Sequence, residues 1–289
     1  MPLFRRSDGD VIDGLPLVRR IMPFLMRGRN ESVVYHDTVY VIASARAWLE
    51  AFNRARPGRP PATLFHLFLW ACARALHERP GLNRFVSGGR VYQRRGVFLS
   101  FAAKRAFRDD APIATCKVEF PARESFVACV DRVVGSIGES RSDKERPVDK
   151  ELKITFAFPT FLIGLGVKLL MWLDRMNLMP AAMIRSDPMY ASLFAANLGS
   201  VGIDDVTHHL YEYGNVSLFG AMGTAGPQVM PGPDGTVVVR DAVKVRWSFD
   251  ERINDGFYCA SSLRLVREVM EDPQAVLGPP TATVASAEH

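Results

Sequence analysis

The sequence predicts an α/β or α+β fold with a mixed β-sheet. Helical and strand patterns alternate along much of the chain, and its last third is rich in strands. Of 289 residues, 48% are hydrophobic and 23% charged, which is an ordinary globular composition with enough apolar material for a sizeable core. We expect an N-terminal arm at residues 1–20, a core domain at 21–277 and a disordered tail at 278–289, which is small and polar.

The first part of the core should contain helices and a strand. Leu17 to Met26 is amphipathic, but Pro23 should break or kink a helix there. Val33 to Ile42 is rich in Val and Tyr, as in a strand, and residues 43–56 have a helical pattern. A long helix is expected from Thr63, a candidate cap, to Glu78. Its apolar residues cover most of its circumference, so it should lie at the centre of the fold.

The middle of the chain predicts short strands and one clear loop. Strands are expected at 90–93, 97–104 and 114–120, and a helix at 125–135. Residues 136–150 are almost entirely polar and predict a loop.

An apolar run from Ile154 to Leu173 leaves three alternatives open. It is long enough to span a bilayer, which takes about 20 residues. Pro159 and the two glycines of the run weaken that interpretation, and Lys168 at mid-span would cost roughly 2.5 to 3.5 kcal/mol. We therefore favour a helix buried in the core or between subunits over association with a membrane surface, and that over membrane spanning.

Charge and cysteine content exclude several classes of protein. The net charge of +5 is spread along the chain, with no basic helix or zinc finger, so nucleic-acid binding is not expected. The four cysteines lack the spacing of a metal site or a disulfide framework, so we expect reduced, buried cysteines and no metal. The N-terminus has no apolar run typical of a secretory signal, which predicts a cytoplasmic protein.

The stretch from Val243 to Gly256 is where we expect chemistry. Residues 243–248 alternate between apolar and polar, as in a half-buried strand, and residues 258–270 have helical spacing. Between them lie Asp250, Glu251, Arg252 and Asp255, followed by Gly256, which permits a tight turn. Upstream, Pro233-Asp-Gly235 predicts a hairpin turn between Val229 and residues 237–239.

Three segments resemble a known family. Residues 75–83 resemble its "A-L-x-x-x-P-x-L-N" stretch, and Phe194-Ala-Ala-Asn-Leu-Gly199 its "F-T-x-S-N-L-G" segment. Phe249-Asp-Glu-Arg-Ile-Asn-Asp-Gly256, with Met270-Glu-Asp-Pro273 after the next helix, resembles its "D-H-R-x-x-D-G... L-E-D-P" ending. The family is the acyltransferase catalytic core of 2-oxoacid dehydrogenase complexes, which shares the fold of chloramphenicol acetyltransferase.

This resemblance implies a two-layer sandwich that assembles as a trimer, with active sites between subunits. Coenzyme A would enter one side of a channel and the acyl acceptor the other. Family cores build trimers into cages of 24 or 60 subunits, of which we expect the cubic 24-subunit form. We expect a free-standing core without lipoyl or subunit-binding domains.

The departures from the family concern its chemistry. The family has the catalytic histidine where this chain has Glu251, and a Ser or Thr that donates to the oxyanion where this chain has Ala196. Asp255, which steadies the family's active-site loop through an arginine contact, is present, as is Gly256. By resemblance, Asp250, Arg252 and Gly256 are structural residues at a subunit interface. The positive charge of Arg252 would make Glu251 a weaker base if their side chains met.

Further residues are candidates through the same resemblance. Asn197, Ser200 and His208 would line the channel for coenzyme A or substrate, and His209 could replace the missing imidazole. A histidine pair in a polar loop also occurs without any catalytic role, and both interpretations stay open.

The sequence therefore supports three hypotheses. The first is a catalytically degenerate homologue that acts as a self-assembling trimer or cage and retains coenzyme A binding. The second is an active coenzyme A-dependent acyltransferase with Glu251 or His209 as base. The third is a membrane-surface protein that uses residues 154–173.

Overall fold

A six-stranded mixed sheet forms the framework of the molecule. The computed structural model describes residues 5–104, 113–141, 156–204, 206–232 and 234–285. The sheet has the order β2-β9-β8-β7-β5-β6. β7 is parallel to both of its neighbours, and the other pairs are antiparallel. The strands are β2 (Val33–Val41), β5 (Phe98–Lys104), β6 (Ile113–Glu119), β7 (Leu193–Asn197), β8 (Leu218–Pro231) and β9 (Val237–Asp250).

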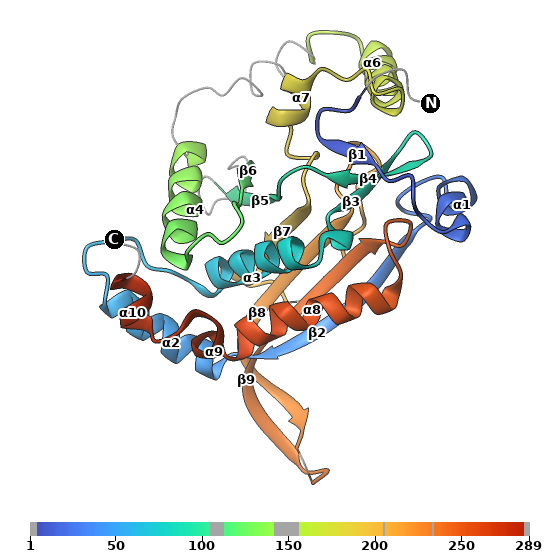
Figure 1. Cartoon of the computed structure of the whole chain (residues 1–289). Helices are drawn as coiled ribbons and strands as arrows, with labels where there is room; N and C mark the ends of the chain where they lie inside the picture. Colours follow the sequence, from blue (N-terminus) through green and yellow to red (C-terminus); the bar gives the residue numbers. More distant parts are fainter. Residues whose placement is uncertain (1–4, 105–112, 142–155, 205, 233, 286–289) are drawn as a thin grey trace.

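Helices cover one face of this sheet, as Figure 1 shows. They are α2 (Ala43–Arg54), α3 (Leu64–Glu78), α4 (Phe126–Arg141) and α8 (Gly256–Glu271). The helix expected from Thr63 to Glu78 is α3, and its predicted central position is confirmed. Most of α3 is buried, and Phe68 packs on Trp247 of β9 with 5.5 Å between the ring centroids. The other face carries a smaller apolar cluster around Phe194 and Phe219, covered by the chain near Leu210 and Val216. The predicted two-layer sandwich with a mixed sheet is confirmed.

The N-terminal segment belongs to the fold, which corrects the boundary expected at residue 20. β1 (Gly9–Val11) joins β4 (Arg90–Arg94) and β3 (Arg84–Ser87) in a small second sheet. Buried Arg6 lies over the ring of Phe85 and donates to Asp174 Oδ1 at 2.6 Å and Asp8 Oδ1 at 2.7 Å. α1 (Leu17–Leu25) crosses the expected boundary and contains Pro23.

Two predicted irregular segments are also corrected. α4 continues through residues 136–141 of the expected loop, because Ile137 packs on the core and the Ser140 hydroxyl lies 3.0 Å from the thiol of Cys116. Residues 142–150 of that loop lie outside the described residues. The tail from 278 was expected to be disordered, but α10 (Pro280–Ala285) follows α9 (Pro273–Leu277), and the Thr283 hydroxyl donates to the Leu277 carbonyl at 2.8 Å.

The apolar run folds as α6 (Thr160–Arg175), followed by the short α7 (Ala181–Ser186). It does not enter the main core of its own chain, contrary to one of the positions that we favoured for it. Most of its large apolar side chains are exposed, and only Leu170 among the described residues of the run packs on a small cluster, that of Met179, Ile184 and Tyr190. The buried residue of α6 is Asp174. None of the helices in the described ranges has the length and hydropathy needed to cross a membrane. Figure 1 places α6 at the edge of the molecule, away from α2.

The remaining predictions concern the hairpin and the cysteines. β8 and β9 form the predicted hairpin, which projects from the body in Figure 1. Gly235 takes the left-handed conformation with φ of 72°, while Pro233 of the expected turn lies outside the described residues. All four cysteines are free and buried, as expected.

Candidate functional site

Glu251 lies in a turn that several elements hold in place. Its backbone N–H donates to the Ser32 carbonyl at 2.9 Å, at the beginning of β2, and its own carbonyl accepts from Arg19 Nη1 at 3.0 Å. Its half-buried carboxylate has no hydrogen-bond or ion-pair partner among the described residues. The carboxylate is therefore available to a ligand or to another subunit.

The two residues beside Glu251 form a buried ion pair. Arg252 donates through Nε and Nη2 to the two carboxylate oxygens of Asp250, at 2.8 and 2.7 Å. Asp250 is 0% and Arg252 3% exposed. The third guanidinium nitrogen of Arg252, Nη1, donates to the carbonyls of Met26 and Arg27, so this pair fastens the chain after α1 to the end of β9. Arg252 faces Asp250, so the condition under which it would weaken Glu251 as a base, a meeting of their side chains, is not met.

Asp255 caps the N-terminus of α8 and contacts an arginine. Its Oδ1 accepts from the Tyr258 N–H at 2.7 Å, which caps the helix, and its Oδ2 lies 3.5 Å from Arg19 Nη2. Gly256 is the first residue of α8. The sequence indicated an arginine contact for Asp255, but only the fold identifies the arginine as Arg19 of α1.

Ala196 lies near the end of β7, with its methyl group on the small apolar cluster. A methyl group cannot donate a hydrogen bond to an oxyanion. Asn197 is the last residue of β7, and the next turn, η2 (Leu198–Val201), contains Ser200, whose hydroxyl donates to the Asn197 carbonyl at 2.7 Å. These three positions form one group.

One chain does not bring Ala196 and Glu251 together. Ala196 lies opposite Ala221 of β8, which lies opposite Arg246 of β9. Glu251 comes five residues after Arg246, roughly 16 Å further along the sheet at the rise of a strand. A site that used both positions would therefore need two copies of the chain.

The histidine pair lies between these two groups. The ring of His208 stacks on Phe219 with centroids 4.0 Å apart, and its backbone carbonyl accepts from the Ser248 hydroxyl, three residues before Glu251. Burial lowers the pKa of His208. Exposed His209 has its Nδ1 3.0 Å from the Leu210 carbonyl, which can only accept, so Nδ1 carries a proton. In the neutral form of the ring, Nε2 is then an acceptor.

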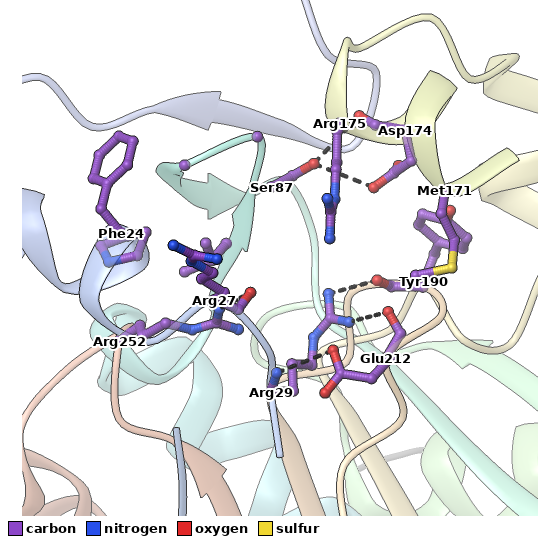
Figure 2. A pocket seen from close by; sticks show the side chains of 15 residues that line it. Phe24, Arg27, Arg29, Ser87, Met171, Asp174, Arg175, Tyr190, Glu212 and Arg252 are labelled. Carbon is purple, nitrogen blue, oxygen red and sulfur yellow. Dashed lines mark hydrogen bonds between the residues drawn. The ribbon is translucent and has the colours of Figure 1, made fainter. Parts of the chain in front are cut away.

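A cavity of about 500 Å³ lies between α1, the β3–β4 turn and α6. Figure 2 shows Arg175 extending from α6 toward Arg29, with Arg27 and Arg252 on the opposite wall. Sequence reasoning missed this cavity, because its arginines come from three separate segments and no local motif marks them. In the described parts of the chain, no group of three or more His, Cys, Asp or Glu side chains is arranged to hold a metal ion.

Comparisons with known proteins agree with this geometry. Residues 185–278, which include Ala196, both histidines and Glu251, match the family model of the 2-oxoacid dehydrogenases acyltransferase catalytic domain. A search of curated proteins gave no match.

Solved structures of low sequence identity share the fold over nearly the whole chain. A probable dihydrolipoamide acetyltransferase from Listeria monocytogenes has a TM-score of 0.59 at 15% identity, covering 90% of this chain and 94% of that one. The cubic core of the pyruvate dehydrogenase multienzyme complex has a TM-score of 0.53 at 16% identity, covering 92% and 94%. A chloramphenicol acetyltransferase has a TM-score of 0.56 at 13% identity, covering 91% and 100%.

The molecule therefore has the fold of the acyltransferases that resemble chloramphenicol acetyltransferase. Within that class, its resemblance to the acyltransferase catalytic core of 2-oxoacid dehydrogenase complexes is confirmed.

Proposed function

We propose that this chain is a catalytically degenerate homologue of the acyltransferase core that acts as a self-assembling trimer, built into a hollow cubic cage. The observation that carries the proposal is the environment of Glu251. A buried ion pair, a capped helix and an arginine from α1 hold this turn in place, yet the residue presented there is a carboxylate. These contacts support the proposal that the chain keeps the supporting structure of the family site without its imidazole.

The size of the expected loss supports degeneracy. Removing an oxyanion donor costs about 10²- to 10³-fold in rate. Removing general base catalysis costs about 10²- to 10⁴-fold. In this proposal, Ala196 stands for the lost oxyanion donor and Glu251 for the lost base, so both losses apply. Acyl transfer by the family route should therefore fall close to the uncatalysed rate, while the fold still binds coenzyme A through the group at Asn197 and Ser200.

Two features support assembly. The separation of Ala196 from Glu251 means that one chain alone cannot form the family's site. The β8–β9 hairpin projects into solvent with Val229, Val237 and Val239 exposed, and apolar side chains on a projecting hairpin suit contact with a neighbouring subunit. Val276 and Leu277 are half-buried against their own core, which favours the hairpin over these two residues as the surface that links subunits.

Sedimentation analysis of the full chain tests this proposal. We expect the mass of a trimer or a multiple of it, and transfer of acetyl from acetyl-coenzyme A to dihydrolipoamide no faster than in a blank. A stable monomer would contradict assembly, and turnover above the blank would contradict degeneracy.

A second candidate is an active coenzyme A-dependent acyltransferase on another acceptor. It is favoured by the carboxylate of Glu251 and by Nε2 of His209, neither of which has a partner among the described residues. Release of thiol from acetyl-coenzyme A that is lost in Glu251→Gln or His209→Ala would establish it.

A further inference from the structure

α6 presents an apolar stripe to solvent. Phe161, Leu165, Leu169 and Trp172 recur every three or four residues, so they lie on one face, and they are 72%, 62%, 53% and 50% exposed. Phe156 and Phe158, just before the helix, are exposed as well. A large contiguous apolar patch on a soluble protein usually marks an interaction surface.

The helix is fastened to the body at its C-terminal end. Buried Asp174 accepts from Arg6 Nη2 at 2.6 Å and from the Ser87 hydroxyl at 3.2 Å. Its 16 residues extend about 24 Å, less than the bilayer core of about 30 Å, and Lys168 lies near its middle. α6 can therefore lie along a membrane but not cross one.

The charge around the stripe has one sign. Between residues 156 and 185, Lys168, Arg175 and Arg185 are exposed, and the single acidic residue is Asp174, which is buried against Arg6. Lys168 and Arg175 are seven residues apart, so they lie in line along the edge of the apolar stripe. An apolar face bordered by basic residues is typical of helices that lie in the headgroup region of anionic membranes.

The arginine cavity opens beside this edge of α6. Arg27 and Arg175 have no side-chain partner among the described residues and point into the cavity from opposite sides (Figure 2). Arg29 is buried and donates to the carbonyls of Tyr211, Glu212 and Gly214, but its Nε has no hydrogen-bond partner within the described part of the chain. Arginine guanidinium groups suit phosphate oxygens.

Two carboxylates line the same cavity. Glu212 accepts from the backbone of Arg29 and from Asn30, and Asp174 is paired with Arg6. Asp250 neutralises Arg252. The uncompensated charge of the cavity is therefore that of Arg27 and Arg175, which is positive.

We propose that α6 binds along the surface of a membrane that contains anionic phospholipids. The apolar stripe enters the boundary between headgroups and acyl chains, and a lipid phosphate occupies the cavity between Arg27 and Arg175. Nothing in this binding requires acyl transfer, so it is independent of the proposed function.

The same stripe on a second copy, packed about a two-fold axis, fits this surface less well. Contact of α6 with itself about a two-fold axis would bring Lys168 and Arg175 of both copies together, and like charges in contact oppose association. A membrane with anionic headgroups instead complements both the apolar stripe and its basic edge.

Flotation of the full chain with vesicles tests the proposal. We expect binding to vesicles of phosphatidylcholine mixed with phosphatidylglycerol, and much weaker binding to phosphatidylcholine alone. The variant Leu165→Ser/Leu169→Ser/Trp172→Ser should reduce binding by more than about tenfold. Its matched control, Val201→Ser/Ile203→Ser/Val206→Ser, removes exposed apolar side chains outside α6 and should bind as the wild type does.

The arginines are tested separately. Arg27→Gln/Arg175→Gln should lower binding to anionic vesicles about thirtyfold, since each arginine near an anionic surface contributes about fivefold. Arg54→Gln/Arg59→Gln, two exposed arginines at the end of α2 and just after it, should change it little. An equal loss of vesicle binding in these two double variants would overturn the proposal that the cavity holds a lipid phosphate, because net charge alone would then explain the binding.

Trp172 provides a measurement that needs no folding control. Trp48 and Trp247 are buried and Trp70 is half-buried, so a blue shift of emission on adding anionic vesicles reports Trp172 and should vanish in Trp172→Phe. Absence of both flotation and blue shift in the wild type would overturn the proposal. A second result would also overturn it. If the wild type does not float, and the α6 variant has a lower oligomeric mass than the wild type, then a second copy of the chain covers the stripe.

Discussion

Arg19 of α1 and Asp255, the N-cap of α8, approach to 3.5 Å across the turn that presents Glu251, and the same arginine donates to the Glu251 carbonyl. Asp255 also caps α8, whereas the ion pair is partly exposed. Asp255→Ala should therefore lower the free energy of unfolding by about 1 to 2 kcal/mol through loss of the cap. Arg19→Gln should lower it by less than about 1 kcal/mol. Urea unfolding measures both, and equal losses would show that the ion pair matters more than the cap.

The Asp250–Arg252 pair should be far more sensitive to substitution. Arg252→Met leaves the carboxylate of Asp250 buried without its counter-ion, which should cost about 3 to 5 kcal/mol of folding free energy. Asp37→Asn, which removes an exposed contact with Arg246 at 3.8 Å, is the control and should change stability by less than about 1 kcal/mol. Calorimetric melting of both variants checks this, and a mild effect of Arg252→Met would contradict it.

His66 should make stability depend on pH. Burial, with Arg56 nearby, lowers the pKa of His66 from 6.5 to about 4, and its Nδ1 accepts from the Thr63 N–H at 3.1 Å. Between pH 4 and 6.5 the unfolded chain binds a proton at His66 that the folded chain does not, so this residue lowers stability as pH falls through that range. The full effect is on the order of 3 kcal/mol.

His66→Gln should abolish this contribution, because glutamine can also reach back to the cap and does not titrate. The measured quantity is the difference in unfolding free energy between wild type and variant at pH 7 and at pH 4. His36→Gln, an exposed position on β2, is the control. A difference that does not change with pH would refute the prediction.

Restoring the two missing groups should restore chemistry if degeneracy is the correct interpretation. Glu251→His/Ala196→Ser should raise acetyl transfer to dihydrolipoamide by at least about 10²-fold over the wild type. Each single variant should gain less, because base and oxyanion donor act in the same step. Thiol release from acetyl-coenzyme A is the measurement. A wild type that already turns over, and stops in Glu251→Gln, would favour the active acyltransferase.

Much of the fold could be predicted because its signals are local. Apolar spacing identified α3 and the β9 strand, and Gly235 identified the hairpin turn. Predictions failed where packing overrode local preference. α4 runs into a polar segment because Ile137 and Ser140 find partners on the core, and α1 accommodates Pro23.

The sequence by itself determined that position 251 is a carboxylate and position 196 a methyl group, and motif order related both to an acyltransferase core. Only the tertiary structure decided that Arg252 faces Asp250, that Arg19 meets Asp255, and that α6 lies exposed beside converging arginines. The reason is physical. Propensity and periodicity act over a few residues, whereas the pairing of charges and the exposure of a helix depend on segments that are far apart in the chain and that only packing brings together.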